Sequence, residues 1–179
     1  MKHVMLDLET MGTVPGSVVL SIGAVFFDEN GLGDEFYTPV SRAHSAALGL
    51  KESKSTQDWW AKQSKEARKV IDDAEHADAP SLTAALEEFS KFIKKDTNVK
   101  VWGNGADFDN PLLICCYDVA ELKQAWVSWN GRCYRTLKNI APGPKLVRVG
   151  TYHNALDDAK SQALHAIELF KQHPTLVMA

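Results

Sequence analysis

The chain has 179 residues, of which 45% are hydrophobic, and a formal net charge of −3. This length fits one ordinary domain of roughly 100 to 200 residues, so we expect a single domain over residues 1–179 and no room for a second catalytic domain. Its longest apolar stretches are far shorter than the roughly 20 residues of a membrane-spanning helix, and the opening segment turns acidic after five positions. We therefore expect no membrane association and no signal peptide.

The cysteines and the charge pattern further limit the classes of protein to which the chain can belong. Cys115, Cys116 and Cys133 form no CxxC pair and leave one cysteine over, which argues against a disulfide framework and a structural zinc site and favours a reducing cytoplasm. A negative net charge gives no general attraction to phosphate. The interval between Glu121 and Asp157, however, contains no acidic residue and carries six basic ones: Lys123, Arg132, Arg135, Lys138, Lys145 and Arg148. This interval is either an ordinary solvated surface or a phosphate-binding one.

The first half of the chain predicts strands followed by helices. Residues 2–9 read as a strand that ends in acids, and residues 17–40 hold two apolar runs around the turn-rich DENGLGDE, which predicts a hairpin. The broken apolar pattern over residues 55–74 predicts two short helices. Pro80 and Ser81 then precede apolar residues spaced three and four apart, which predicts a helix up to Ile93.

The second half alternates strand and helix. Residues 98–105 predict a short buried strand ended by two glycines, residues 107–122 a helix, and residues 154–172 a final amphipathic helix with Pro174 just beyond it. The pairing of strand and helix implies that the fourth strand runs parallel to a neighbour. The whole pattern predicts an α/β layered domain with a mixed sheet.

Carboxylates from three separate segments are the candidates for metal binding. Asp7 and Glu9 lie two apart on a predicted strand, so both point to one face. Asp109 follows the fourth strand, and Asp157 and Asp158 begin the last helix; each also fits a helix cap or a favourable charge at a helix start. Four such acids suit two Mg²⁺ or Mn²⁺ ions, which prefer oxygen ligands and stabilise charge at phosphorus.

A histidine precedes the last of these acids. His153 stands five residues before Asp158, and an imidazole near neutral pKa can accept a proton from an attacking water. Tyr152 beside it is the alternative proton acceptor. A structural or surface role is the other interpretation of either residue.

Three motifs together resemble the DEDD exonucleases of the histidine subgroup: DLET, GNGADFDNPLL and HNALDDA. That subgroup has H-x-x-x-x-D, which His153 and Asp158 satisfy, whereas the tyrosine subgroup has Y-x-x-x-D, whose tyrosine position is Asn154 here. The length and the segments WGNGADFDN and RTLKNIA look most like small exonucleases of phages and prophages, some labelled exodeoxyribonuclease VIII, which are related to an actinobacterial 3′→5′ exoribonuclease.

The resemblance implies an RNase H-like fold with helices on both faces of a mixed sheet, two Mg²⁺ or Mn²⁺ ions, release of 5′-monophosphates and a homodimer. Carried over residue by residue, it puts metal ligands at Asp7, Glu9, Asp109 and Asp158 and a general base at His153. The motif here has one residue more than the usual N-x-x-F-D, which leaves Asp107 as an alternative to Asp109 and leaves the role of Asn104 open.

For the substrate, Thr10 and Met11 are expected beside the terminal nucleotide, and Arg135 and Lys138, three apart on a helical turn, are expected to contact phosphates. The five tryptophans offer stacking surfaces for bases. Trp102 is better explained as a core residue, and Trp59 and Trp60 as packing of a helix. The expected partner is the 3′ end of single-stranded or frayed RNA or DNA. The alternatives are an RNase H-like endonuclease and a non-catalytic nucleic-acid-binding module on the same fold.

Overall fold

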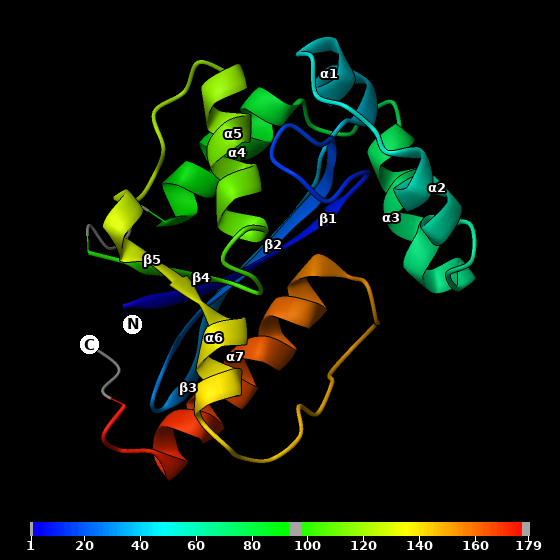
Figure 1. Ribbon diagram of the computed structural model, residues 1–179. Helices are drawn as coiled ribbons and strands as arrows, with labels where there is room; N and C mark the ends of the chain where they lie inside the picture. The colour runs from blue at the N-terminus through cyan, green and yellow to red at the C-terminus, as the bar shows by residue number, and fades with distance from the viewer. Residues whose placement is uncertain (1, 94–97, 177–179) are drawn as a thin grey trace.

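The computed structural model describes residues 2–93 and 98–176, which form a five-stranded sheet with helices (Figure 1). The strands are β1 (His3–Thr10), β2 (Val19–Asp28), β3 (Gly31–Pro39), β4 (Lys100–Gly103) and β5 (Gly131–Cys133). The helices are α1 (Arg42–Ala47), α2 (Lys54–Trp60), α3 (Lys65–Glu75), α4 (Leu82–Ile93), α5 (Asp109–Val119), α6 (Tyr134–Ile140) and α7 (Ala155–Gln172), with a 3₁₀ turn at Ser128–Asn130.

The sheet is mixed, as predicted. Its strand order is β3-β2-β1-β4-β5, with β1 and β3 antiparallel to β2 and with β4 parallel to both β1 and β5. The predicted hairpin is the β2–β3 pair, and the predicted parallel strand is β4. The central position of β1 places its C-terminal end, where the acids Asp7 and Glu9 lie, in the middle of one sheet edge.

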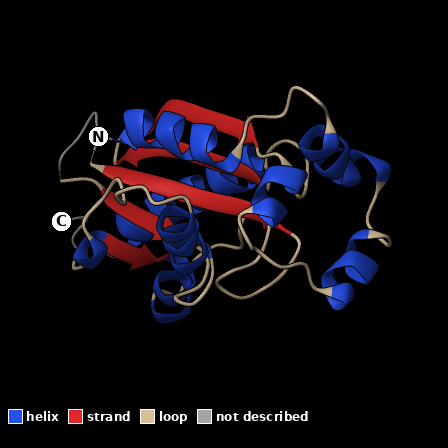
Figure 2. Cartoon of the chain, turned by 90° about the horizontal axis from the view of Figure 1, so that it is seen from above, coloured by secondary structure: helices blue, strands red, loops and turns tan. Residues whose placement is uncertain are grey.

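Helices cover both faces of the sheet, which confirms the predicted layering (Figure 2). Side chains of β1 alternate between the two faces: Val4, Leu6 and Leu8 pack in a cluster with α3, α4 and α5, while Met5 packs in a second cluster with α6 and α7. By the same alternation Asp7 and Glu9 share the face of Met5, toward α7. The sequence pattern of the first strand therefore decides which helix meets the acids.

The start of α7 lies directly against β2, and a glycine permits this approach. A Cβ atom at Gly23 would lie 2.2 Å from the backbone nitrogen of Leu156, so any side chain there would push the helix away. Gly23 is the β2 partner of Asp7. The absence of a side chain at this position thus brings the first turn of α7, with Asp158, to the acids of β1.

The predicted helices are present with small shifts of their ends. The segment 55–74 gives α2 and α3, the segment after Ser81 gives α4, and the last two predicted helices are α5 and α7. The sequence did not predict α1 or the three-residue strand β5. None of the helices that the structure describes combines the length and apolar character that a membrane-spanning helix needs.

Candidate active site

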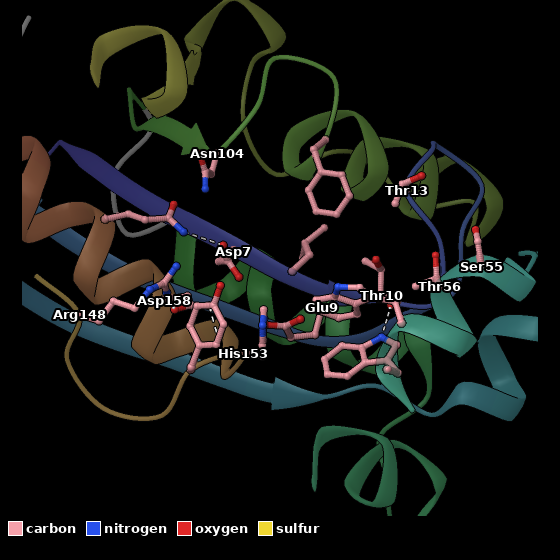
Figure 3. A pocket seen from close by; sticks show the side chains of 16 residues that line it. Asp7, Glu9, Thr10, Thr13, Ser55, Thr56, Asn104, Arg148, His153 and Asp158 are labelled. Carbon is pink, nitrogen blue, oxygen red and sulfur yellow. Dashed lines mark hydrogen bonds and ion pairs between the residues drawn. The ribbon is translucent and has the colours of Figure 1, made fainter. Parts of the chain in front are cut away.

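A cavity of about 510 Å³ lies at the C-terminal end of β1, between α2, the start of α7 and the loop before α7 (Figure 3). Asp7, Glu9, His153 and Asp158 all line it, so four of the five predicted catalytic residues meet there. They come from two segments more than 140 residues apart in the sequence. This cavity is the candidate active site.

Asp7 and Glu9 lie two apart on β1, the first half-buried and the second buried. The side-chain amide of Gln162 donates to Oδ1 of Asp7 at 2.8 Å. Burial, together with the charges of Asp109, Glu9 and Asp158, raises the pKa of Asp7 well above its usual range. Burial and the charges of Asp158 and Asp109 raise the pKa of Glu9 to about 8. Each carboxylate therefore opposes ionisation of the others unless a cation compensates them.

Asp109, the fifth predicted catalytic residue, does not line the cavity but contacts the backbone of β1. Its Oδ1 accepts the backbone N–H of Leu8 at 3.2 Å, and its Oδ2 accepts that of Asn104 at 2.6 Å. Burial raises its pKa to about 6, and these two donors oppose the rise. Asp109 is 1% exposed, whereas Asp107 is exposed to solvent. The geometry thus favours Asp109 over Asp107 as the member of the acidic cluster, while its role as a metal ligand stays a prediction.

Asp158 and His153 meet at the start of α7. The backbone N–H of His153 donates to Oδ2 of Asp158 at 3.3 Å. Glu9, His153 and Asp158 each offer a ligand atom, and these atoms lie within 4.8 Å of one another. Burial raises the pKa of Asp158, and the charge of Arg148 opposes this rise. Burial also lowers the pKa of His153, which keeps the imidazole neutral near pH 7.

The loop that presents His153 is held in an uncommon conformation. His153 has a φ of 62°, in the left-handed region, and Gly150 has a φ of 69°. The carboxylate of Asp157 accepts the backbone N–H of Thr151 at 2.7 Å, while the side chain of Asn154 caps α7 by accepting two backbone N–H groups. Asp157 therefore has a structural role in fixing the loop, separate from its neighbour Asp158.

Aromatic side chains surround the imidazole. The ring of His153 lies 3.8 Å from that of Tyr152 and 4.9 Å from that of Trp59, the latter edge to face. Trp60 is buried, and its indole N–H donates to the backbone oxygen of Thr10 at 2.9 Å. The expectation that this tryptophan pair packs a helix thus holds for Trp60, whereas Trp59 is 42% exposed and lines the cavity.

The four residues predicted to bind substrate are placed differently from one another. Thr10 lines the cavity, and its hydroxyl donates to the backbone oxygen of Gly12. Met11 is 2% exposed in the hydrophobic core and does not line the cavity, and its place beside the terminal nucleotide stays a prediction. Arg135 and Lys138 lie on α6 outside the cavity.

Of these two basic residues, only one reaches the rim of the cavity. The guanidinium of Arg135 donates to the backbone oxygen of Asn104, a residue that lines the cavity. The ammonium of Lys138 instead lies 5.6 Å from the ring centroid of Tyr134. Phosphate contacts by either residue stay a prediction, and Arg135 is the better placed.

Among the residues that sequence reasoning missed, two polar side chains of the cavity contact the predicted acids. Gln162 lies four residues after Asp158 on α7, one helical turn on, and this spacing was the signal that could have found it. Arg148 was counted only as part of the basic interval. Its guanidinium pairs with Asp158 and lies 4.0 Å from the ring centroid of Tyr152. A loop without periodicity gave no sign that this particular arginine faces the acids.

Solved structures with similar folds agree with the predicted architecture. The nuclease domain of 3′hExo, a DEDDh family member bound to rAMP, superimposes with a TM-score of 0.64 at 15% identity, over 96% of this chain and 92% of that one. Exonuclease X in complex with 5′ overhanging duplex DNA gives a TM-score of 0.60 at 14% identity, over 96% of this chain and 93% of that one. The predicted RNase H-like fold is thereby confirmed.

Sequence comparison identifies the family. The exodeoxyribonuclease of Enterobacteria phage T4 is 31% identical over 121 residues, which are 61% of this chain and 52% of the phage protein, so the chain spans about half the length of that relative. The profile of the 3′-5′ exoribonuclease Rv2179c-like domain matches residues 2–170. This match confirms the predicted kinship with a 3′→5′ exoribonuclease: the chain belongs to the Rv2179c-like 3′-5′ exoribonuclease domain family.

Proposed function

We propose that this chain is a metal-dependent 3′→5′ exonuclease that hydrolyses single-stranded or frayed RNA or DNA and releases 5′-monophosphates. The observation that carries the proposal is the convergence of Asp7, Glu9, Asp158 and His153 on one cavity, with Asp109 hydrogen-bonded to the backbone of Leu8, which also lines it. Membership of the Rv2179c-like exoribonuclease domain family and the likeness to the phage exodeoxyribonuclease support the same reaction.

The donor set fits hard divalent cations. Glu9, His153 and Asp158 bring three ligand atoms within 4.8 Å, and the buried carboxylates nearby have pKa values raised by burial and mutual repulsion. Oxygen-rich donors of this kind suit Mg²⁺ or Mn²⁺. Asp7, Glu9, Asp109 and Asp158 would hold two such ions, whose contribution is Lewis-acid stabilisation of the charge that develops at phosphorus.

His153 is the proton acceptor in this proposal. Its lowered pKa keeps the ring neutral near pH 7, so a ring nitrogen is free to take a proton from the attacking water. The strained backbone at His153 and the ring contacts with Tyr152 and Trp59 hold the imidazole at the acids. Asn154 occupies the position that a tyrosine would need, and its side chain is engaged in capping α7.

The shape of the cavity favours cleavage at a strand end. Ser55 and Thr56 of α2, with Thr13, line one end of the cavity beyond Glu9 and Thr10 (Figure 3). A strand that passes along the acids meets this wall, so its terminal nucleotide would stop there. An endonuclease needs the strand to continue on both sides of the acids, and the wall argues against this alternative.

A gel assay tests the proposal. Purified protein is incubated with 5′-labelled single-stranded RNA and DNA oligonucleotides in Mg²⁺, Mn²⁺ or EDTA, beside Asp158→Ala and His153→Ala. We expect a ladder that shortens from the 3′ end, that is lost in EDTA and in both variants, and whose rate with each oligonucleotide gives the preferred sugar. Asp107→Ala, which removes an exposed acid next to the site, is the matched control and keeps the activity.

Other product patterns would identify the alternatives. Internal fragments would indicate an endonuclease. Binding of the oligonucleotides without any metal-dependent shortening would indicate the non-catalytic binding module. The homodimer remains a separate prediction, which sedimentation equilibrium of the purified chain decides.

A further inference from the structure

Arg148 occupies an unusual place for a basic residue. Among the residues that line the cavity in the described part of the chain, it is the only arginine or lysine. Its guanidinium Nη1 donates to Oδ1 of Asp158, a member of the Glu9–His153–Asp158 group that can hold a metal ion. The positively charged guanidinium of Arg148 is therefore already paired with a carboxylate that the proposed reaction requires as a ligand for a divalent cation.

The two oxygens of Asp158 are both engaged. Oδ1 accepts from Arg148 and Oδ2 accepts from the backbone N–H of His153. The second bond belongs to the loop that presents His153, whereas the first is made by a long side chain that is 47% exposed. A divalent cation that binds Oδ1 competes with the guanidinium, because two positive charges at one oxygen repel each other.

The displaced guanidinium has a second contact nearby. Its Cζ lies 4.0 Å from the ring centroid of Tyr152, which is itself 52% exposed at the rim of the cavity. A guanidinium on an aromatic face keeps its N–H groups directed outward in the plane of the group, where they match a phosphate. Arg148 can thus leave Asp158 and still remain at the mouth of the cavity.

The backbone that follows Arg148 is held at two points. The backbone N–H of Val149 donates to the buried hydroxyl of Ser161 on α7 at 2.9 Å. Two residues later, the backbone N–H of Thr151 donates to Asp157. Rotation of the Arg148 side chain is therefore a motion that leaves both of these backbone bonds intact.

We propose that Arg148 alternates between two partners: it neutralises Asp158 while no divalent cation is bound, and it binds a phosphate of the substrate strand once a cation has taken Oδ1 of Asp158. The inference deepens the proposed function and rests on it. It also links strand binding to the loaded site, because the guanidinium is paired with Asp158 in the cation-free cavity and becomes available to a phosphate only once a divalent cation is bound.

The first test measures cation affinity without turnover. Mn²⁺ is titrated by calorimetry into the wild type, Arg148→Gln and Lys145→Gln. Because Arg148→Gln removes a competing charge from Asp158, its dissociation constant for Mn²⁺ is expected to fall about ten-fold. Lys145→Gln removes the same charge from the same loop, but Lys145 is exposed outside the cavity, so its Mn²⁺ affinity should match that of the wild type.

The second test measures strand affinity in the same proteins. With Mn²⁺ present, fluorescence anisotropy follows a 5′-fluorescein-labelled single-stranded oligonucleotide whose 3′-terminal linkages are phosphorothioates, which slow hydrolysis. Arg148→Gln is expected to bind about ten-fold or more weakly, and its log–log salt slope should fall by about 1. Arg148→Lys keeps the charge but loses the planar fork, so it should bind Mn²⁺ like the wild type and the strand with intermediate affinity.

The proposal expects Arg148→Gln to bind Mn²⁺ more tightly and the strand more weakly. Loss of a purely structural role would weaken both kinds of binding. Unchanged or weaker Mn²⁺ binding by Arg148→Gln, or unchanged strand binding, would overturn it. If Arg148→Gln does not fold, Arg148→Lys carries the test, and strand binding equal to that of the wild type refutes the phosphate contact. Failure of the proposed function would appear elsewhere, as absence of metal-dependent shortening by the wild type.

Discussion

Replacing Glu9 by Gln is expected to stabilise the cation-free protein and to abolish its hydrolytic activity. Glu9 is 7% exposed and lies among other buried acids. Burial, followed by the charges of Asp158 and Asp109, raises its pKa from 4.5 to about 8. Gln has the same shape as the protonated carboxyl but cannot ionise, so the variant avoids the free-energy cost of placing a charge there.

The direction of the pKa shift gives the sign of the stability change, and the shifted value gives its size. The pKa in the folded state lies above that in the unfolded state, so the contribution of Glu9 to stability is fully present below pH 4.5 and is lost as the pH rises to about 8. One pKa unit corresponds to about 1.4 kcal/mol, which gives a cost of about 3 kcal/mol at pH 7. For a chain of this size that is roughly 6–12 °C in Tm.

Thermal unfolding in EDTA at pH 5, 7 and 8 measures this directly. The Tm of Glu9→Gln should match that of the wild type at pH 5 most closely and exceed it increasingly at pH 7 and 8. Glu87→Gln, which removes an exposed acid on α4, should stay within about 0.5 kcal/mol of the wild type at each pH. Saturating Mg²⁺ should raise the Tm of the wild type, because at 100 times Kd it adds about 2.7 kcal/mol to the free energy of unfolding. It should raise the Tm of Glu9→Gln much less.

Two results would refute this reasoning. If Glu9→Gln unfolds in EDTA at the same temperature as the wild type at pH 8, the carboxylate is not repelled by its neighbours. If Mg²⁺ stabilises the variant as much as the wild type, Glu9 is not a ligand, whatever happens to the activity.

Three further predictions test other parts of the structure. Burial lowers the pKa of His3 from 6.5 to about 4, so the stability it contributes is complete above pH 6.5 and is lost as the pH falls toward 4; between pH 7.5 and 4.5, denaturant titrations should show a change in unfolding free energy that differs by about 2–3 kcal/mol between the wild type and His3→Gln, with the wild type losing more stability at the lower pH. Gly150→Ala should cost about 1–3 kcal/mol of unfolding free energy and reduce kcat, because Gly150 has a φ of 69° and a Cβ atom there would lie 2.2 Å from the carboxylate of Asp157. A variant as stable as the wild type would contradict this loop geometry. Asp109→Asn should lower kcat by about two orders of magnitude while Asp107→Asn keeps it, and the reverse order in the gel assay would identify Asp107 as the ligand.

The local part of the fold could be predicted from the sequence because its signals are local. The apolar periodicity of α4 and α7 and the turn-rich segment between β2 and β3 each lie within one window of the chain. By contrast, β5 is only three residues, Gly-Arg-Cys, with no apolar pattern, and it becomes a strand because β4 pairs with it. The short helix α1, Arg-Ala-His-Ser-Ala-Ala, also lacks an amphipathic repeat, although the side chain of Ser41 caps it.

The candidate site likewise has a part that the sequence predicts and a part that it does not. Asp7, Glu9, His153 and Asp158 carry motif spacings that are visible in the sequence itself, and all four line the cavity. The cavity walls are not visible there, because they depend on how distant segments pack. The role of Gly23 is one example. Nothing in the sequence of a strand says that the start of α7 will come so close that a Cβ atom at this residue would lie 2.2 Å from the helix backbone.

The charges around the cavity explain why the net charge of −3 is a poor guide to the substrate. Electrostatic interactions in salt decay over roughly 8 Å, so a phosphate at the cavity responds to the nearest groups and not to the total. Without cations Arg148 neutralises Asp158, and the raised pKa values of Asp7 and Glu9 favour their neutral forms, so the cavity offers a polyanion no net positive charge. Two divalent ions would add four positive charges and attract it. The same acids that destabilise the cation-free fold are therefore what makes strand binding depend on metal, and the strand affinity of the wild type should rise with Mn²⁺ concentration far more steeply than that of Glu9→Gln.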